Sequence, residues 1–220
     1  MIHVLRAPKP PILVAKEAQW KSKIRGASTD KNRQEAQDRY KHDQIKNSLV
    51  AMFHGKCAYC ESQITHIDYG HIEHFKPKSL PKYFLLAVDW DNLLLACGRC
   101  NGSENKGVKF PNSKQGGPLV NPAEDDPSQH FKFDFDKTTR LANVLGISKR
   151  GETTWRIFGL NRPELVQRRS DFVKKLWVIA TRYQVDAEAK AIIDAAVMDD
   201  AEYAAFAREL KRLVDSGVFN

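Results

Sequence analysis

The sequence has little that would direct the chain to a membrane or to an oxidising compartment. No stretch approaches the roughly 20 consecutive apolar residues that a membrane-spanning helix needs. Residues 1–11 carry prolines and charges where a signal peptide would carry an apolar core. Cysteine is also scarce, and in a reducing cytosol the 4 cysteines of this chain indicate a metal site before a disulfide framework. We therefore expect a cytoplasmic protein with no membrane partner.

What remains is a globular composition with an excess of basic residues. The 220 residues suffice for one sizeable core or two small domains. The formal net charge is +8, which favours a polyanionic partner because basic side chains release counterions from phosphates. Many basic proteins bind no nucleic acid, so the charge alone is a weak indication.

The hydrophobic pattern predicts an α+β fold in which most of the helix lies outside a short central segment. Residues 1–30 are expected to form an irregular arm because three prolines fall within the first eleven residues. The periodicity and turn residues of the rest predict helices over about 30–53, from about 162 and over 200–214, strands around 70–75 and 92–96, and a hairpin of 131–135 with 141–144. We expect three segments: residues 1–53 (N-terminal arm and helix), 54–125 (the segment that carries the chemistry) and 126–220 (mainly helical).

The cysteines predict a structural zinc site. All of them fall into two Cys-x-x-Cys pairs, Cys57 with Cys60 and Cys97 with Cys100. Four thiolates satisfy the tetrahedral preference of Zn²⁺ and leave no open position for catalysis. Redox chemistry, a disulfide or a different metal such as iron is the alternative.

Between and directly after the cysteine pairs lies a set of residues whose side chains could take part in catalysis. It comprises the stretch from Gly70 to Lys78 (GHIEHFKPK), the stretch from Trp90 to Leu93 (WDNL), and Asn101 directly after the second pair. This set resembles the motif of HNH, or ββα-metal, endonucleases, in which an acidic residue, His, a hydrophobic residue, any residue and Pro lie on the first strand. The corresponding residues here run from Glu73 to Pro77.

The resemblance implies a role for each motif residue. His74 would be the general base, since a neutral imidazole can take a proton from water at cellular pH. Glu73 and Asn101 would hold the catalytic cation, Mg²⁺ or Mn²⁺, because hard cations prefer oxygen ligands. Asn92 would lie in the connecting loop and either orient the imidazole or hold the loop. Asn105 is a rival for Asn101.

Basic residues near this motif are candidates for phosphate contacts. Lys76, Lys78 and Lys106 could reach phosphates beside the scissile one, and His71 could approach either the metal or the scissile phosphate. On the long C-terminal helix, Arg168, Lys175 and Arg182 recur every seven residues and form a basic stripe. This stripe is equally well a solvated face.

Further stretches around the motif make the resemblance specific to one group of HNH nucleases. The stretches Cys57 to Glu61, Ile72 to Ser79, Asp89 to Leu93 and Gly159 to Asn161 are similar to the HNH nuclease subunits of Septu-type and retron-associated anti-phage systems. Such subunits act with an ATPase of the ABC type, so the resemblance implies such a partner. The C-terminal stripe of Tyr203, Phe206 and Leu210 is one candidate docking surface, although core packing is the simpler interpretation.

Taken together, these residues lead us to expect a metal-dependent endonuclease that hydrolyses phosphodiester bonds in DNA. One alternative is a non-catalytic zinc module that binds nucleic acid or assembles a complex. Another is a ribonuclease of the same fold. The enzyme and the non-catalytic module differ in one testable respect: only the enzyme requires the side chain of His74 for its activity.

Overall fold

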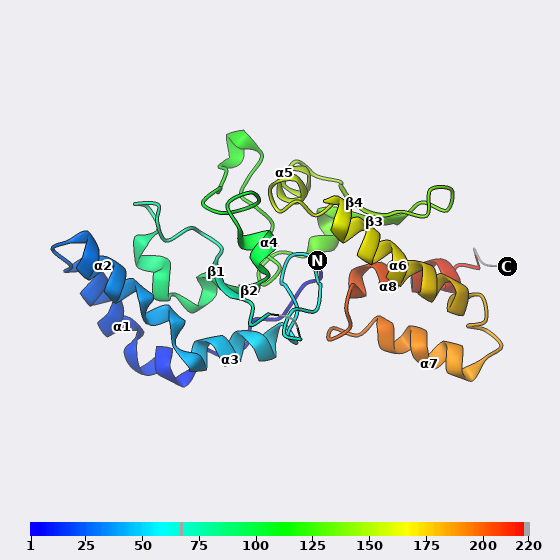
Figure 1. The fold of residues 1–220 in the computed structure, drawn as a ribbon, viewed down its shortest axis with the longest axis horizontal. Coiled ribbons are helices and arrows are strands. Elements are labelled where there is room, and N and C mark those ends of the chain that lie inside the picture. The colour runs from blue at the N-terminus through cyan, green and yellow to red at the C-terminus, as the bar shows by residue number, and fades with distance from the viewer. Residues whose placement is uncertain (67, 218–220) are drawn as a thin grey trace. The chain divides into compact units, whose positions relative to one another are not determined.

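The chain forms two compact units in a computed structural model that describes residues 1–66 and 68–217 (Figure 1). The hairpin unit comprises residues 4–58 and 63–110, and the helical unit comprises residues 1–3, 59–62 and the chain from Pro111 onwards. Residues 4–53, which we expected to form a segment of their own, therefore pack with the predicted strands around 70–75 and 92–96. In the described part of the chain no helix is both long and apolar enough to cross a membrane.

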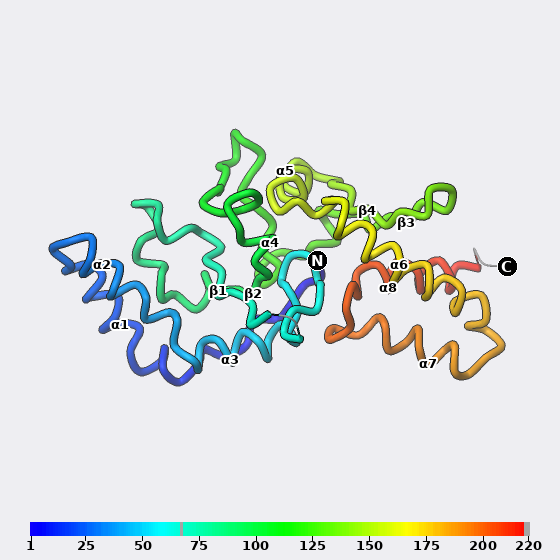
Figure 2. The backbone as a smooth tube through the Cα atoms, viewed as in Figure 1, coloured from blue at the N-terminus to red at the C-terminus, as the bar shows by residue number. Residues whose placement is uncertain are grey.

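The hairpin unit places two short strands beside three N-terminal helices. Its elements are α1 (Pro11–Arg25), α2 (Asp30–Gln37), α3 (Asp43–Met52), β1 (His71–His74), β2 (Leu93–Ala96) and α4 (Gly98–Asn101). Helices α1 and α2 pack against each other, and α3 packs against β2. The path of the backbone through these elements can be followed in Figure 2.

The expectation of an irregular arm over residues 1–30 is wrong. Helix α1 begins at Pro11, a position where proline is favoured because the first N–H of a helix has no partner to lose. Its buried residues Leu13, Trp20 and Ile24 recur at the spacing of one helix face. The prolines thus start the helix and do not prevent it.

The single helix predicted over 30–53 is divided. Helix α2 ends at Gln37, a 3₁₀ helix follows over Asp38–Lys41, and α3 begins after His42, whose extended backbone breaks the run. Within α3, Ile45, Leu49 and Met52 are buried, as the periodicity predicted.

Both predicted hairpins are present. In the hairpin unit β1 pairs antiparallel with β2, so that His71 lies opposite Ala96 and His74 opposite Leu93. All residues of β2 are buried, which explains its continuous apolar run. In the helical unit β3 (Phe131–Phe135) pairs with β4 (Ala142–Gly146).

Four helices complete the helical unit: α5 (Lys149–Ile157), α6 (Pro163–Ala180), α7 (Ala187–Ala196) and α8 (Ala204–Asp215). The sequence predicted α6 and α8 but not α5 or α7. Helix α5 has a Ser148 N-cap, whose hydroxyl accepts from the N–H of Gly151, yet its buried residues are Gly151 and Thr154, so it has no stripe of large apolar residues that would indicate it.

The stripe of Tyr203, Phe206 and Leu210 belongs to the core of the helical unit. These side chains are 1%, 4% and 3% exposed. The idea that they form a docking surface is therefore wrong, because these side chains are already buried within the unit.

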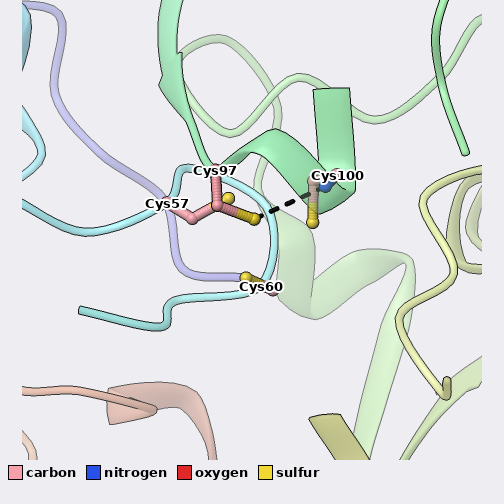
Figure 3. Close-up of side chains that lie close together, drawn as sticks. All are labelled: Cys57, Cys60, Cys97 and Cys100. Carbon is pink, nitrogen blue, oxygen red and sulfur yellow. Dashed lines mark hydrogen bonds between the residues drawn. The ribbon is translucent and has the colours of Figure 1, made fainter. Parts of the chain in front are cut away.

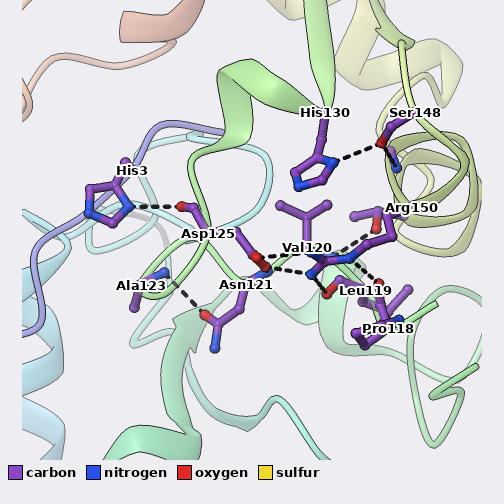
Figure 4. A network of polar contacts seen from close by, with 12 residues as sticks. His3, Pro118, Leu119, Val120, Asn121, Ala123, Asp125, His130, Ser148 and Arg150 are labelled. Carbon is purple, nitrogen blue, oxygen red and sulfur yellow. Dashed lines mark hydrogen bonds and ion pairs between the residues drawn. The ribbon is translucent and has the colours of Figure 1, made fainter. Parts of the chain in front are cut away.

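A polar network ties the turns of the helical unit to α5 (Figure 4). The guanidinium of Arg150 donates to both carboxylate oxygens of Asp125, at 3.0 and 2.7 Å, and to the carbonyls of Pro118 and Leu119. Burial favours the neutral form of Asp125, but the hydrogen bonds from Arg150 and the Asn121 N–H outweigh it and hold the pKa of this carboxyl below its usual range.

Candidate functional site

The four cysteines meet at one point, as their spacing predicted. Their Sγ atoms all lie within 4.8 Å of one another, and Figure 3 shows them gathered between a loop and the start of α4. Four thiolates around Zn²⁺ at about 2.3 Å would stand roughly 3.8 Å apart, so the cluster needs only a small contraction to hold the ion. The donor set and its burial fit structural zinc.

The chain between the cysteine pairs has the order strand, strand, helix. Strand β1 carries His71, Glu73 and His74, β2 leads to Cys97, and α4 carries Cys100 and Asn101. Cys97 is also the N-cap of α4 and accepts from the N–H of Cys100 at 3.4 Å. The cysteines therefore fix where the hairpin meets the helix.

His74 is held in the interior in one orientation. The residue is 7% exposed, and its Nε2 lies 2.9 Å from the carbonyl oxygen of Ala87. A carbonyl can only accept, so Nε2 carries the ring proton and Nδ1 keeps a lone pair. Burial lowers the pKa of His74 to about 4, which keeps the imidazole neutral at physiological pH. The ring can therefore accept a proton at Nδ1.

Glu73 lies beside a buried lysine. Its carboxylate is 3% exposed and forms an ion pair with the ammonium of Lys106, which also donates to the carbonyl oxygen of His74 at 2.7 Å. Burial raises the pKa of Glu73 to about 7, although Lys106 acts in the opposite direction. The ammonium of Lys106 does not fully offset the effect of burial on this carboxylate. The carboxylate could therefore also hold a metal cation.

Asn92 holds the backbone around His74. Its side-chain oxygen accepts from the N–H of Lys76 at 2.8 Å, and its Nδ2 donates to the carbonyls of Lys76 and Leu86 at 3.0 and 3.1 Å. Leu86 directly precedes Ala87, whose carbonyl binds the imidazole. Of the two roles left open for Asn92, these contacts favour holding the loop.

The two rival asparagines differ in their contacts. Asn105 donates from its side chain to the carbonyl of Arg99 at 2.7 Å, so it braces the turn after α4. Asn101 lies on α4 itself, one turn after Gly98. A side chain at Gly98 would stand 3.3 Å from His71 Nε2, so the exposed His71 ring lies against the start of this helix.

The basic candidates separate into two groups. Lys76 and Lys78 are partly exposed, and the ammonium of Lys78 lies 5.5 Å from the centre of the Tyr40 ring. Lys106 is 1% exposed. The expectation that Lys106 contacts a phosphate is therefore corrected: its ammonium is enclosed by Glu73 and the His74 carbonyl and has no surface to offer a ligand.

Two residues contribute to the site without having been singled out from the sequence. Tyr40 meets the His74 ring edge to face, with centroids 4.5 Å apart. Arg6 donates to the carbonyls of Trp90, Asp91 and Leu93 and so fixes the turn that leads into β2. Tyr40 lies within the helix predicted over 30–53, and Arg6 lies within the arm predicted to be irregular. The sequence therefore indicates no role in the site for either residue.

Comparison with known proteins agrees with this geometry. Residues 57–107 match the HNH endonuclease family. This segment is an HNH domain. The HNH domain thus takes in both cysteine pairs, Glu73, His74, Asn92 and Asn101.

Relatives of the chain extend the likeness beyond the HNH domain. It is 38% identical over 160 residues to Septu protein PtuB of Bacillus mycoides, covering 62% of this chain and 53% of that protein. It is 32% identical over 163 residues to Septu protein PtuB of Bacillus thuringiensis, covering 74% and 55%. It is also 26% identical over 150 residues to Septu protein PtuA of Bacillus mycoides, covering 57% of this chain and 20% of that protein. The chain spans about half the length of the PtuB proteins it matches.

Proposed function

We propose that the chain is a metal-dependent endonuclease that hydrolyses phosphodiester bonds in DNA, with His74 as its general base. The observation that supports this most is the fixed tautomer of His74: Nε2 is bound to the Ala87 carbonyl, so the basic nitrogen is Nδ1. A water molecule that attacks phosphorus must lose a proton, and a neutral imidazole with an available lone pair can accept it.

The residues around His74 have supporting roles in this proposal. Asn92 keeps the backbone on both sides of the imidazole in place through Lys76 and Leu86. Lys76, Lys78 and His71 lie close in sequence to Glu73 and His74 and are not fully buried, so they can contact the phosphates that flank the scissile bond.

The proposal includes two kinds of metal ion. Cys57, Cys60, Cys97 and Cys100 would hold a structural Zn²⁺ that joins the hairpin to α4. Glu73 and Asn101 would hold Mg²⁺ or Mn²⁺, which when bound neutralises charge on the phosphate oxygens. Buried Lys106 keeps the Glu73 carboxylate in position and balances its negative charge when the divalent cation is absent.

We further propose that the chain acts in anti-phage defence together with an ATPase of the ABC type. The relatives named Septu proteins support this, and so does the presence of a helical unit much larger than the HNH domain requires. A cytoplasmic location follows from this role, because the DNA of an infecting phage is met there.

The test is nicking of supercoiled plasmid by the zinc-loaded chain in Mg²⁺ or Mn²⁺, with His74→Ala as the variant and an RNA of equal length as a parallel substrate. Metal-dependent nicking of DNA that is lost in His74→Ala is expected. Cleavage of RNA alone would replace DNA by RNA as the substrate.

A second arm separates the enzyme from a zinc-binding module. If neither protein cuts alone, the assay is repeated with the purified ATPase partner and ATP. Absence of cleavage in that mixture as well, with unchanged DNA binding in His74→Ala, would leave the non-catalytic module as the correct description.

A further inference from the structure

The helical unit contains a pocket that the proposed catalytic residues do not use. It has a volume of about 300 Å³ and lies between the turn of the β3–β4 hairpin and α6. Its lining consists of three cations, two aromatic rings and one aliphatic side chain: Lys137, Arg140, Lys174, Phe135, Trp177 and Val178. A concave site that combines cations with aromatic rings is suited to a ligand with both negative charge and a planar ring.

The aromatic part of the pocket is formed by Phe135 and Trp177. Their ring centroids are 5.4 Å apart at an angle of 39°, and the Lys137 ammonium lies 5.1 Å from the centre of the Trp177 ring. Val178, the next residue on α6, is 69% exposed. The pocket therefore offers an accessible apolar and aromatic surface beside a mobile positive charge.

Two of the three cations of the pocket, Lys137 and Arg140, have no carboxylate partner among the described residues, whereas Lys174 has one. Asp136 uses its side-chain oxygen to accept from the N–H groups of Thr138 and Thr139, at 2.7 and 3.1 Å. Asp134 pairs with Lys132 at 2.9 Å outside the pocket, and Asp171 lies 3.5 Å from Lys174. Within residues 1–66 and 68–217, no carboxylate is in ion-pair range of Lys137 or Arg140.

The backbone of the turn presents these two cations outward. The N–H of Arg140 donates to the carbonyl of Asp136 at 2.7 Å, and Arg140 has a left-handed φ of 56°. A non-glycine residue in this conformation is uncommon and is held here by the closed turn. Beyond the pocket, Arg182 is exposed in the turn that follows the end of α6.

We propose that this pocket binds an unpaired nucleotide of a nucleic-acid strand, with its base against Trp177 and its phosphates at Lys137 and Arg140. The choice of ligand rests on the proposed function, because a nuclease must meet a nucleic acid. Bases of a duplex are stacked and cannot present a face to a tryptophan, whereas an unpaired base can. An acidic peptide would satisfy the cations but has no planar ring of its own to lie against Trp177.

The test is fluorescence anisotropy of a labelled single-stranded oligo-dT with the full zinc-loaded chain, in buffer without added Mg²⁺ or Mn²⁺. The main variant is Lys137→Gln with Arg140→Gln. The matched control is Lys149→Gln with Lys190→Gln, which removes the same charge from exposed positions elsewhere in the unit. Trp177→Leu and Trp177→Phe test the aromatic contribution, with thermal melting to confirm that each variant folds.

The phosphate contacts and the aromatic contact are expected to change different measured quantities, the salt dependence and the affinity. Loss of two phosphate contacts should reduce the slope of log K against log salt by about 1.4, since each single-strand phosphate contributes about 0.7. Trp177→Leu should weaken binding about fivefold or more with the slope unchanged, and Trp177→Phe should weaken it less. The control pair should leave the slope as in the wild-type chain.

Three outcomes would overturn the proposal: an equal loss of affinity in the control pair, tighter binding of a duplex of the same length, or equal competition by poly-glutamate. Because binding is measured without a catalytic cation, these results are independent of nicking. A chain that binds through the pocket but does not cut, either alone or with the ATPase partner and ATP, would refute the proposed function and leave this site intact.

Discussion

The ammonium of Lys106 contacts the carboxylate of Glu73 in the interior of the hairpin unit, and the two side chains are 1% and 3% exposed. The lysine also donates to the carbonyl of His74. A buried cation therefore joins the strand that carries the proposed base to the turn that follows α4. The same carboxylate is our proposed ligand for the catalytic cation, so folding and catalysis share one group.

Removing Lys106 should destabilise the domain strongly. Lys106→Met keeps an unbranched side chain without the ammonium and leaves Glu73 buried without its partner, which typically costs about 3–5 kcal/mol. We expect the free energy of unfolding in urea to fall by that amount at neutral pH. Adding Glu73→Gln should recover much of the loss, because an uncharged pair no longer needs compensation. A double variant as unstable as Lys106→Met would show that the ion pair is not the cause.

We expect Asn92 to act by holding the backbone around His74 in place and not by taking part in the reaction. Asn92→Asp keeps the acceptor for the Lys76 N–H but loses both donated hydrogen bonds, to the carbonyls of Lys76 and Leu86. Each buried carbonyl left without a partner costs about 1–3 kcal/mol. We expect a lower melting temperature and slower nicking with the zinc content unchanged. Full stability together with lost nicking would instead indicate direct participation in catalysis.

The two asparagines near α4 should respond differently to substitution. Asn101→Ala should raise the concentration of Mg²⁺ or Mn²⁺ needed for half-maximal nicking, because it removes a proposed oxygen ligand. Asn105→Ala should mainly lower stability, since Asn105 donates to the Arg99 carbonyl. The measurement is a metal titration of both variants in parallel. The reverse order of effects would assign the last motif position to Asn105.

Zinc should be required for the fold of the HNH domain. We expect one zinc per chain by elemental analysis, and we expect Cys100→Ser to lose it together with the hairpin signal in circular dichroism. The binding energy of structural zinc, about 10–16 kcal/mol in small zinc peptides, explains why a segment with two four-residue strands can be stable. A metal-free wild-type chain with an unchanged melting temperature would contradict this role.

The stability of the helical unit should depend on acid through Asp125. The pKa of Asp125 is held below its usual range when the chain is folded, so its contribution is present above the unfolded value of about 3.9 and is lost as pH falls through the folded pKa. Asp125→Asn should therefore show a smaller decrease in unfolding free energy between neutral and acidic pH. Equal pH dependence in both proteins would exclude this ion pair as the source.

The clustering of the four cysteines was predictable, because the spacing of two Cys-x-x-Cys pairs carries the information. The order of Glu73, His74 and Asn92 matches a motif, and their roles in catalysis stay predictions. The role of Lys106 was not predictable, because nothing in the sequence separates a lysine on the surface from one that burial has paired with a carboxylate. Its position directly after Asn105 in a polar turn even favoured exposure.

The fold was predictable where the apolar period is long. Helix α6 and both hairpins follow from their patterns, whereas the irregular arm predicted over residues 1–30 is wrong because Pro11 begins α1. The break at His42 is marked locally by an N-cap, because its side chain accepts from the N–H of Gln44. The apolar period does not predict this break, since it continues across His42.

The most direct measurement of the central claim is chemical rescue of His74. Replacing it with glycine removes the imidazole and leaves a space beside Ala87, so free imidazole can enter and take the proton in its place. We predict that His74→Gly does not nick plasmid in Mn²⁺, that added imidazole restores nicking in proportion to its concentration, and that Asn92→Asp shows no such rescue. Nicking by His74→Gly at the wild-type rate without imidazole would contradict the assignment of His74 as the base.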